Sequence, residues 1–166
     1  MRTHPVVMCA FARMTDDGAA SPSRVRSWLY VVVQFSCLAG IAITGPLISV
    51  NGPLCAIEVL GFGLGLWAIV AMRPGNFNII PEVVPGGHLE VQGPYRYIRH
   101  PMYAAVLLVS LPLVIDSFTF VRLVIWVILC VDLILKLRYE EALLVRQFPN
   151  YAPYQMRTKR LVPGIW

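Results

Sequence analysis

Residues 28–72 decide the fold: WLYVVVQFSCLAGIAITGPLISV (28–50), the turn NGP (51–53) and LCAIEVLGFGLGLWAIVAM (54–72). The first segment has 23 residues and no charged side chain, and Glu58 is the only charged residue in the second. As helices, both segments are long enough to cross a hydrocarbon core of about 30 Å. The three-residue connection predicts that the two helices form an antiparallel hairpin.

The composition of the whole chain extends this prediction. Of 166 residues, 57% are hydrophobic, and only 14 Lys and Arg and 9 Asp and Glu carry a charge. Soluble domains contain roughly 25% charged residues, so a water-soluble core of this size would lack the polar surface to cover it. Low charge also argues against disorder, and no charged heptads indicate a coiled coil. We therefore predict a small all-α integral membrane protein.

The second half of the chain predicts another hairpin. A polar interlude rich in Pro and Gly is followed by two apolar stretches, 102–115 and 120–137. The apolar pattern continues past 137 to Phe148-Pro149, so we expect the last helix to extend two to three turns into the cytosol. Residues 1–27 have the composition of a flexible tail. The expected fold is thus about four transmembrane helices in two hairpins.

The basic residues predict the orientation in the membrane. Thirteen of the fourteen Lys and Arg lie in the tail, in the interlude 73–101 or after Leu135, and Arg122 is the exception. By the positive-inside rule, both termini and the interlude face the cytoplasm. Any active site should therefore lie at the cytoplasmic membrane face. The net charge of +5 follows from this topology, so we expect no nucleic-acid partner.

Smaller signals indicate packing. Gly61, Gly63 and Gly65 predict close approach of a neighbouring helix. The cysteines show neither CxxC pairing nor metal-ligand spacing, so we predict no metal site and assign them to packing: Cys9, Cys37, Cys55 and Cys130. Glu58 has no predicted role.

Two polar clusters could carry chemistry, GPYRYIRHPMY (93–103) and KLRYEE (136–141). An interfacial belt accounts for the tyrosines and arginines of the first cluster but gives no reason for His100 immediately before a helix-starting proline. In the second, an ordinary i, i+4 ion pair of Lys136 is the structural alternative. Asp132, one turn earlier, needs a partner or a water-filled pocket inside a membrane span. Together the clusters suit a cationic, water-soluble cofactor and a lipidic substrate.

These clusters resemble the membrane methyltransferases grouped around isoprenylcysteine carboxyl methyltransferase, which are distantly similar to phospholipid N-methyltransferases. The resemblance covers about 80 residues, essentially the C-terminal half. Its most specific part is Arg-His-Pro-x-Tyr followed about forty residues later by Glu-Glu. The matching positions are Gly87-His88-Leu89, Gly93-Pro94-Tyr95, Arg99 to Tyr103, Glu140-Glu141, Phe148, Tyr151, Tyr154 and Arg160 to Pro163.

The resemblance implies a methyltransferase domain over 28–166 with S-adenosylmethionine as methyl donor, bound by residues within 86–103 and 136–163. The implied cofactor-binding residues are His88, Leu89, Tyr95, His100, Pro101, Met102, Tyr103, Glu140 and Glu141. Lys136 stands where the family holds the substrate carboxylate, and Arg138 and Arg99 complete the candidate catalytic residues. Two positions depart from the family: Ala105 replaces a usual Gly, and Lys136 replaces the Arg of eukaryotic enzymes, whose planar two-point contact Lys cannot make.

The leading expectation is carboxyl O-methylation of an isoprenylcysteine-like or other lipidic acid, with a lipophilic or prenylated substrate supplied from the membrane lipid. N-methylation of a phospholipid such as phosphatidylethanolamine is the alternative, and it requires His100 or a Glu to accept a proton. NADPH-dependent membrane reductases share His-Pro-x-Tyr but usually have Asn and Gly-Glu where this chain has Met102 and Ala104-Ala105. A non-enzymatic membrane protein is the remaining interpretation. The sequence leaves the acceptor and the oligomeric state open.

Overall fold

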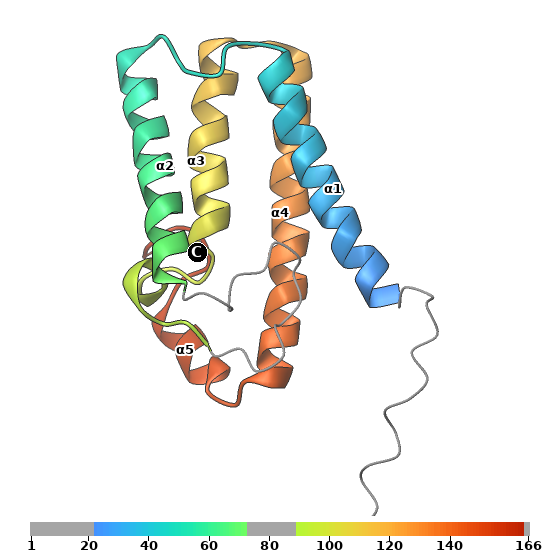
Figure 1. Ribbon diagram of the computed structural model, residues 1–166, viewed down its shortest axis with the longest axis vertical. Helices are drawn as coiled ribbons and strands as arrows, with labels where there is room; N and C mark the ends of the chain where they lie inside the picture. Colours follow the sequence, from blue (N-terminus) through green and yellow to red (C-terminus); the bar gives the residue numbers. More distant parts are fainter. Residues whose placement is uncertain (1–21, 73–88, 165–166) are drawn as a thin grey trace, which may run out of the picture.

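The computed structural model describes residues 22–72 and 89–164, which form a bundle of helices (Figure 1). Over these ranges the chain is α-helical, and its β pairing is limited to an isolated parallel bridge between Ile98 and Lys159. The helices in chain order are α1 (Pro22–Ile43), α2 (Gly52–Ala71), the 3₁₀-helix η1 (Gly93–Arg96), α3 (Pro101–Asp116), α4 (Phe120–Gln147) and α5 (Tyr151–Arg157). The all-α prediction is confirmed for this part of the chain.

Local sequence signals account for most helix ends. Pro101 occupies the first turn of α3, where its missing N–H breaks no helical hydrogen bond. The Thr119 hydroxyl caps α4 by accepting a hydrogen bond from the Arg122 amide at 3.2 Å. At its other end α4 stops before Phe148-Pro149, ten residues beyond the predicted span end at 137. The prediction of a long final helix that continues past its apolar stretch is confirmed.

The predicted boundaries of the first span were wrong. The helix α1 begins at Pro22, inside the predicted tail, and ends at Ile43 rather than at Val50. Gly45-Pro46 follows its last turn, and this pair favours a loop over a continued helix. The remaining predicted tail, 1–21, lies outside the described residues.

The loop 44–51 is tied to the bundle by two carboxylates. Ser49 donates to the buried Glu58 carboxylate from its backbone amide, at 3.1 Å, and from its hydroxyl. The Val50 amide donates to Asp116 Oδ2 at 2.8 Å. Because these bonds satisfy loop amides that the helices cannot, Glu58 acquires a structural role that the sequence did not indicate.

The first predicted hairpin was also wrong as a packed unit. The main helix contacts are α2 with α3, α1 with α4, and α3 with α4, and Figure 1 shows the loop from α1 passing over α3 to reach α2. The connection is therefore not the three-residue turn that was predicted. The second hairpin, α3 with α4, is confirmed. Its contact includes a hydrogen bond of 3.1 Å from Trp126 Nε1 to Ser110 Oγ.

Glycines in α2 let α3 approach closely. A Cβ at Gly61 would lie 2.9 Å from Leu108 Cβ and from Val109 Cγ2, and a Cβ at Gly65 would lie 3.3 Å from Ala105 Cβ. Nothing lies within 4 Å of a Cβ placed at Gly63. The packing prediction thus holds for two of the three glycines.

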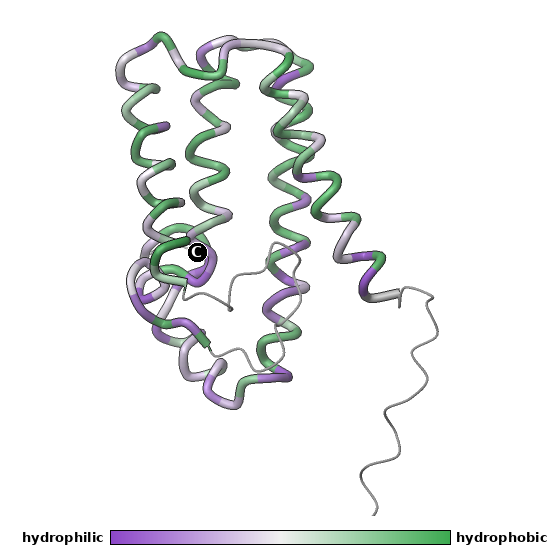
Figure 2. The backbone as a smooth tube through the Cα atoms, viewed as in Figure 1, coloured by the Kyte–Doolittle hydropathy of each residue, from purple (hydrophilic) through white to green (hydrophobic). Residues whose placement is uncertain are grey.

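Within residues 22–72 and 89–164, two helices are long and apolar enough to cross a membrane, α1 from Arg24 and α2 over its whole length. The apolar α3 has 16 residues, fewer than a full span. Large apolar side chains on α1 and α2 face outward, among them Trp28, Leu29, Phe35, Leu60, Phe62, Leu66 and Trp67. Figure 2 shows hydrophobic residues along the bundle and hydrophilic ones gathered at the end with α5. The structure is consistent with a membrane protein, and four crossings remain a prediction.

Candidate functional site

The polar end of the bundle brings together segments far apart in the sequence: η1, the first turn of α3, the last turns of α4, and the chain after α5 (Figure 1). Backbone hydrogen bonds join them. The Arg99 amide donates to the Lys159 carbonyl at 2.7 Å, and the His100 amide donates to the Arg160 carbonyl at 3.0 Å. The C-terminal segment is thereby aligned beside the start of α3.

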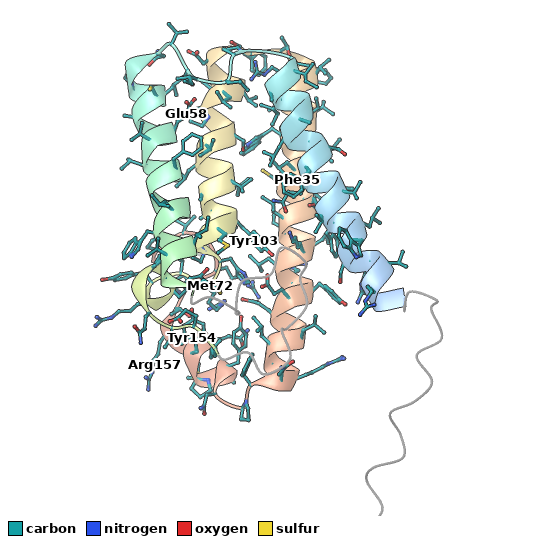
Figure 3. All side chains as sticks on the ribbon, viewed as in Figure 1. Phe35, Glu58, Met72, Tyr103, Tyr154 and Arg157 are labelled. Atoms are coloured by element: carbon teal, nitrogen blue, oxygen red, sulfur yellow. The ribbon has the colours of Figure 1, made fainter. Side chains whose placement is uncertain are left out.

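Three side chains from α3 and α4 form what we term the His100–Tyr103–Glu140 cluster. The Tyr103 hydroxyl donates to Glu140 Oε2 at 2.7 Å, and His100 Nδ1 lies 3.6 Å from the same oxygen. The rings of His100 and Tyr103 stack with centroids 5.3 Å apart and planes within 3°. Figure 3 shows Tyr103 between α3 and α4. Glu140 keeps 30% of its side chain exposed, whereas His100 is buried, so the carboxylate is the accessible member.

The Tyr95 hydroxyl is a buried polar atom near this cluster and has no hydrogen-bond partner among the described residues, whereas the buried His100 Nε2 faces Glu141 Oε1 at 3.6 Å. Burial, followed by the nearby Glu140 carboxylate, raises the pKa of Tyr95, so its hydroxyl stays protonated and able to donate. The backbone of Tyr95 is held separately, because its carbonyl accepts from the Tyr154 hydroxyl at 2.6 Å. Buried polar groups are usually satisfied, so the Tyr95 hydroxyl is available to a ligand.

Glu141 lies between two arginines, an arrangement that we term the Arg99–Glu141–Arg160 clamp. Arg99 Nε donates to Oε1 at 2.7 Å, and Arg160 Nε donates to Oε2 at 3.0 Å. His100 Nε2 is 3.6 Å from Oε1. Burial alone would raise the pKa of Glu141, but the adjoining His100 ring and Arg99 guanidinium outweigh it and lower the value to about 2. The carboxylate is therefore a charged link between α4 and the flanking segments.

The same clamp reaches α5 and the residues after it. Arg99 Nη1 donates to the Gln155 carbonyl at 3.0 Å and also to the Thr158 carbonyl. Arg99 thus uses its donors within the protein, on a carboxylate of α4 and on C-terminal carbonyls. This explains why the last turns of α4, the start of α3 and the C-terminal segment keep one arrangement.

Lys136 lies deeper in the bundle and makes a contact that the sequence did not indicate. Its Nζ donates to Gln34 Oε1 of α1 at 2.8 Å and lies 5.2 Å from the centroid of the Tyr103 ring. Within the described ranges Lys136 forms no ion pair within 4 Å, so the structural alternative, an i, i+4 ion pair with Glu140 or with Asp132, is not formed. Glu140 bonds Tyr103 instead. Gln34 is the one carboxamide side chain in the predicted span 28–50, and that was the signal that could have revealed it.

The other predicted site residues differ in placement. Pro101 is buried, Met102 and Leu89 are half-buried, and Arg138 is exposed on α4. His88 lies outside the described residues. The structure therefore brings together Tyr95, His100, Tyr103, Glu140 and Lys136, and it directs Arg99 and Glu141 into the clamp. In 22–72 and 89–164 no three His, Cys, Asp or Glu side chains gather as a metal site would need.

A comparison with known protein families gives a match over the part of the chain that holds these side chains. The family model of isoprenylcysteine carboxyl methyltransferase matches residues 54–146, which include η1, α3 and almost all of α2 and α4. That range is more than half of the chain and contains every predicted site residue, whereas α1, α5 and Arg160 lie outside it. A search of the curated proteins finds no match. The chain therefore belongs to the isoprenylcysteine carboxyl methyltransferase family, and its membership implies a methyltransferase.

Proposed function

We propose that this protein transfers the methyl group of S-adenosylmethionine to the carboxylate of a lipophilic, isoprenylcysteine-like acid. The observation that carries the proposal is the placement of an accessible carboxylate, Glu140, and a buried ammonium, Lys136, on either side of Tyr103 in the contact network. Tyr103 bonds the first through its hydroxyl and approaches the second with its ring. A cationic methyl donor and an anionic acceptor require these two opposite charges close together.

The available side chains fit this cofactor. Glu140 can accept hydrogen bonds from an ammonium or a ribose hydroxyl, and the Tyr95 hydroxyl is a buried donor without a partner in the described part of the chain. His100 would shape the pocket through its stacking on Tyr103. Leu89, Pro101 and Met102 would supply apolar walls. S-adenosylmethionine supplies a methyl group on a sulfonium sulfur. We assign its binding to these residues, with His88 as a further candidate.

The protein's own contribution is positioning and exclusion of water. Alignment of two reactants can supply on the order of 7 to 11 kcal/mol. A carboxylic acid is already ionised near neutral pH, so an O-methylation needs no general base. Lys136 would orient the acceptor carboxylate, with the exposed Arg138 as the alternative. We assign Arg99 and Glu141 to holding the C-terminal segment over the site, since their contacts are with other parts of the protein.

We also propose a membrane placement. The outward apolar side chains of α1 and α2 would contact lipid, and α1 to α4 would cross the bilayer with the polar end at the cytoplasmic face. The cofactor would then reach the site from the cytosol. A prenylated or otherwise lipophilic acceptor would reach it from the bilayer.

The first experiment is calorimetric binding of S-adenosylmethionine, S-adenosylhomocysteine and NADPH to the detergent-purified protein. We expect both adenosyl ligands to bind wild type and to lose affinity in Glu140→Gln and His100→Ala. Failure of a folded wild-type protein to bind either adenosyl ligand would refute the proposal, and binding of NADPH alone would favour a reductase.

The acceptor is tested separately with radiolabelled methyl donor. Wild type is offered a farnesyl thioether acid and, in a parallel assay, phosphatidylethanolamine vesicles. Label in a base-labile ester identifies carboxyl methylation. If only the phospholipid is labelled, the acceptor is an amine and not the proposed carboxylate.

A further inference from the structure

The buried amide of Gln34 lies in α1, outside the range that matches the family model. Its Oε1 must be the atom that faces Lys136, because an ammonium donates hydrogen bonds and accepts none. The amide NH₂ is therefore fixed on the other side of the same planar group. None of its described neighbours accepts a hydrogen bond from it.

We propose that Gln34 and Lys136 together bind the acceptor headgroup, a carboxylate, with Gln34 as a specificity-determining residue. This inference rests on the proposed function and deepens it. Lys136 donates one hydrogen bond to Gln34 and has two further N–H groups. The Gln34 NH₂ adds a second, differently placed donor. An ammonium plus an amide can thus contact both oxygens of one carboxylate, as a single planar guanidinium does.

The surroundings favour an anion at this position. Lys136 and Gln34 are buried, where a hydrogen bond to a charge is strong. Asp132 and Glu140 are the carboxylates one turn before and after Lys136 on α4, but both lie beyond 4 Å from Lys136 Nζ, whose described bond is to the neutral amide. Lys136 is therefore not neutralised by direct contact. Its position 5.2 Å from the Tyr103 ring centroid also places it next to the cluster assigned to the methyl donor.

Gln34→Glu separates a headgroup contact from mere support of Lys136. Glutamate has nearly the same shape and holds Lys136 at least as well, but it removes the NH₂ donor and places a negative charge against the acceptor. Gln34→Leu removes both interactions. Adding Lys136→Arg to Gln34→Leu supplies two donors from one side chain and should restore them. Ser36→Ala, on the exposed side of α1, is the matched control.

The measurement is the affinity of detergent-purified protein for N-acetyl-S-farnesylcysteine and for its primary amide, with S-adenosylhomocysteine affinity recorded in every variant. We expect Gln34→Glu and Gln34→Leu to weaken binding of the acid by about 10- to 100-fold, the range for a hydrogen bond to a charged group. Binding of the amide and of S-adenosylhomocysteine should stay within about twofold. The double variant should regain most of the acid affinity.

The outcomes are distinguishable. If Gln34→Glu binds the acid like wild type, or if wild type does not distinguish acid from amide, the assignment of Gln34 is overturned. If wild type binds neither adenosyl ligand, the proposed methyl transfer is refuted. The assignment of Gln34 to a methyl-acceptor site is then refuted as well, whatever the affinity for N-acetyl-S-farnesylcysteine.

Discussion

Replacement of Glu141 by Gln tests the clamp directly. The side chain keeps its size but loses its charge, and its two oxygens currently accept from Arg99 Nε at 2.7 Å and from Arg160 Nε at 3.0 Å. In the variant, one carboxylate oxygen becomes an NH₂ group that faces an arginine donor. The two guanidinium groups then lack the counter-charge that the clamp provides.

The expected loss of stability is about 3 kcal/mol. Breaking a buried ion pair by removing one partner costs roughly 3 to 5 kcal/mol. Glu141 and Arg99 are buried, with 6% and 8% of their side chains exposed, but Arg160 is 32% exposed and is partly rehydrated when released. We therefore take the lower end of the range. For a chain of this length the loss corresponds to a fall of about 6 to 12 °C in unfolding temperature.

The assay is thermal unfolding in detergent, combined with limited trypsin digestion at the basic residues of the C-terminal segment, Arg157, Lys159 and Arg160. We expect Glu141→Gln to unfold earlier and to be cleaved faster at these sites. The control is Glu140→Gln, whose amide oxygen still accepts from Tyr103 and whose stability should change by less than about 1 kcal/mol. Wild-type stability and cleavage in Glu141→Gln, or an equal loss in the control, would refute the clamp.

Three further results are expected. Gly61→Ala should be less stable than Gly63→Ala by about 1 to 3 kcal/mol in chemical unfolding, because only the first added Cβ meets α3 while the gain in helix propensity is shared; equal stabilities would contradict the packing. Tyr103→Phe should bind S-adenosylhomocysteine about 10- to 100-fold more weakly by calorimetry, since it loses the hydrogen bond to Glu140 but keeps its ring. An unchanged affinity would show that this hydrogen bond does not contribute to ligand binding. Because the folded pKa of Glu141 is lowered to about 2 from 4.5, its contribution to stability is complete above about pH 4.5 and is lost as the pH falls towards 2. The difference in unfolding temperature between wild type and Glu141→Gln should therefore be constant at higher pH and shrink in acid. If the difference shrinks already near neutral pH, a group other than Glu141 causes the pH dependence.

Several features were predictable because they depend on neighbours in the chain. Pro101 marks the start of α3, and Pro149 follows the end of α4, since proline lacks the N–H that a helix interior needs. The first span was predicted to end too late because its apolar composition concealed the break at Gly45-Pro46. Apolar composition measures compatibility with lipid, whereas the end of a helix depends on backbone hydrogen bonds.

The roles of adjacent carboxylates could not be read from the sequence. Glu140 and Glu141 carry the same chemistry, yet one reaches Tyr103 while the other lies between two arginines. Neighbouring positions on a helix point about 100° apart, so each meets a different element. Which element lies there depends on how α3 and the C-terminal segment pack.

By itself the sequence determined an apolar, helical chain with its polar chemistry near 93–103 and 136–141, and it indicated the family to which the chain belongs. Only the tertiary structure decided that α1 packs on α4 rather than on α2, that Gln34 meets Lys136 across 102 positions, and that Arg99 meets Glu141 across 42. The physical reason is that helix formation is governed by residues three or four apart in the sequence. The contacts between helices depend instead on which faces of the helices pack against one another.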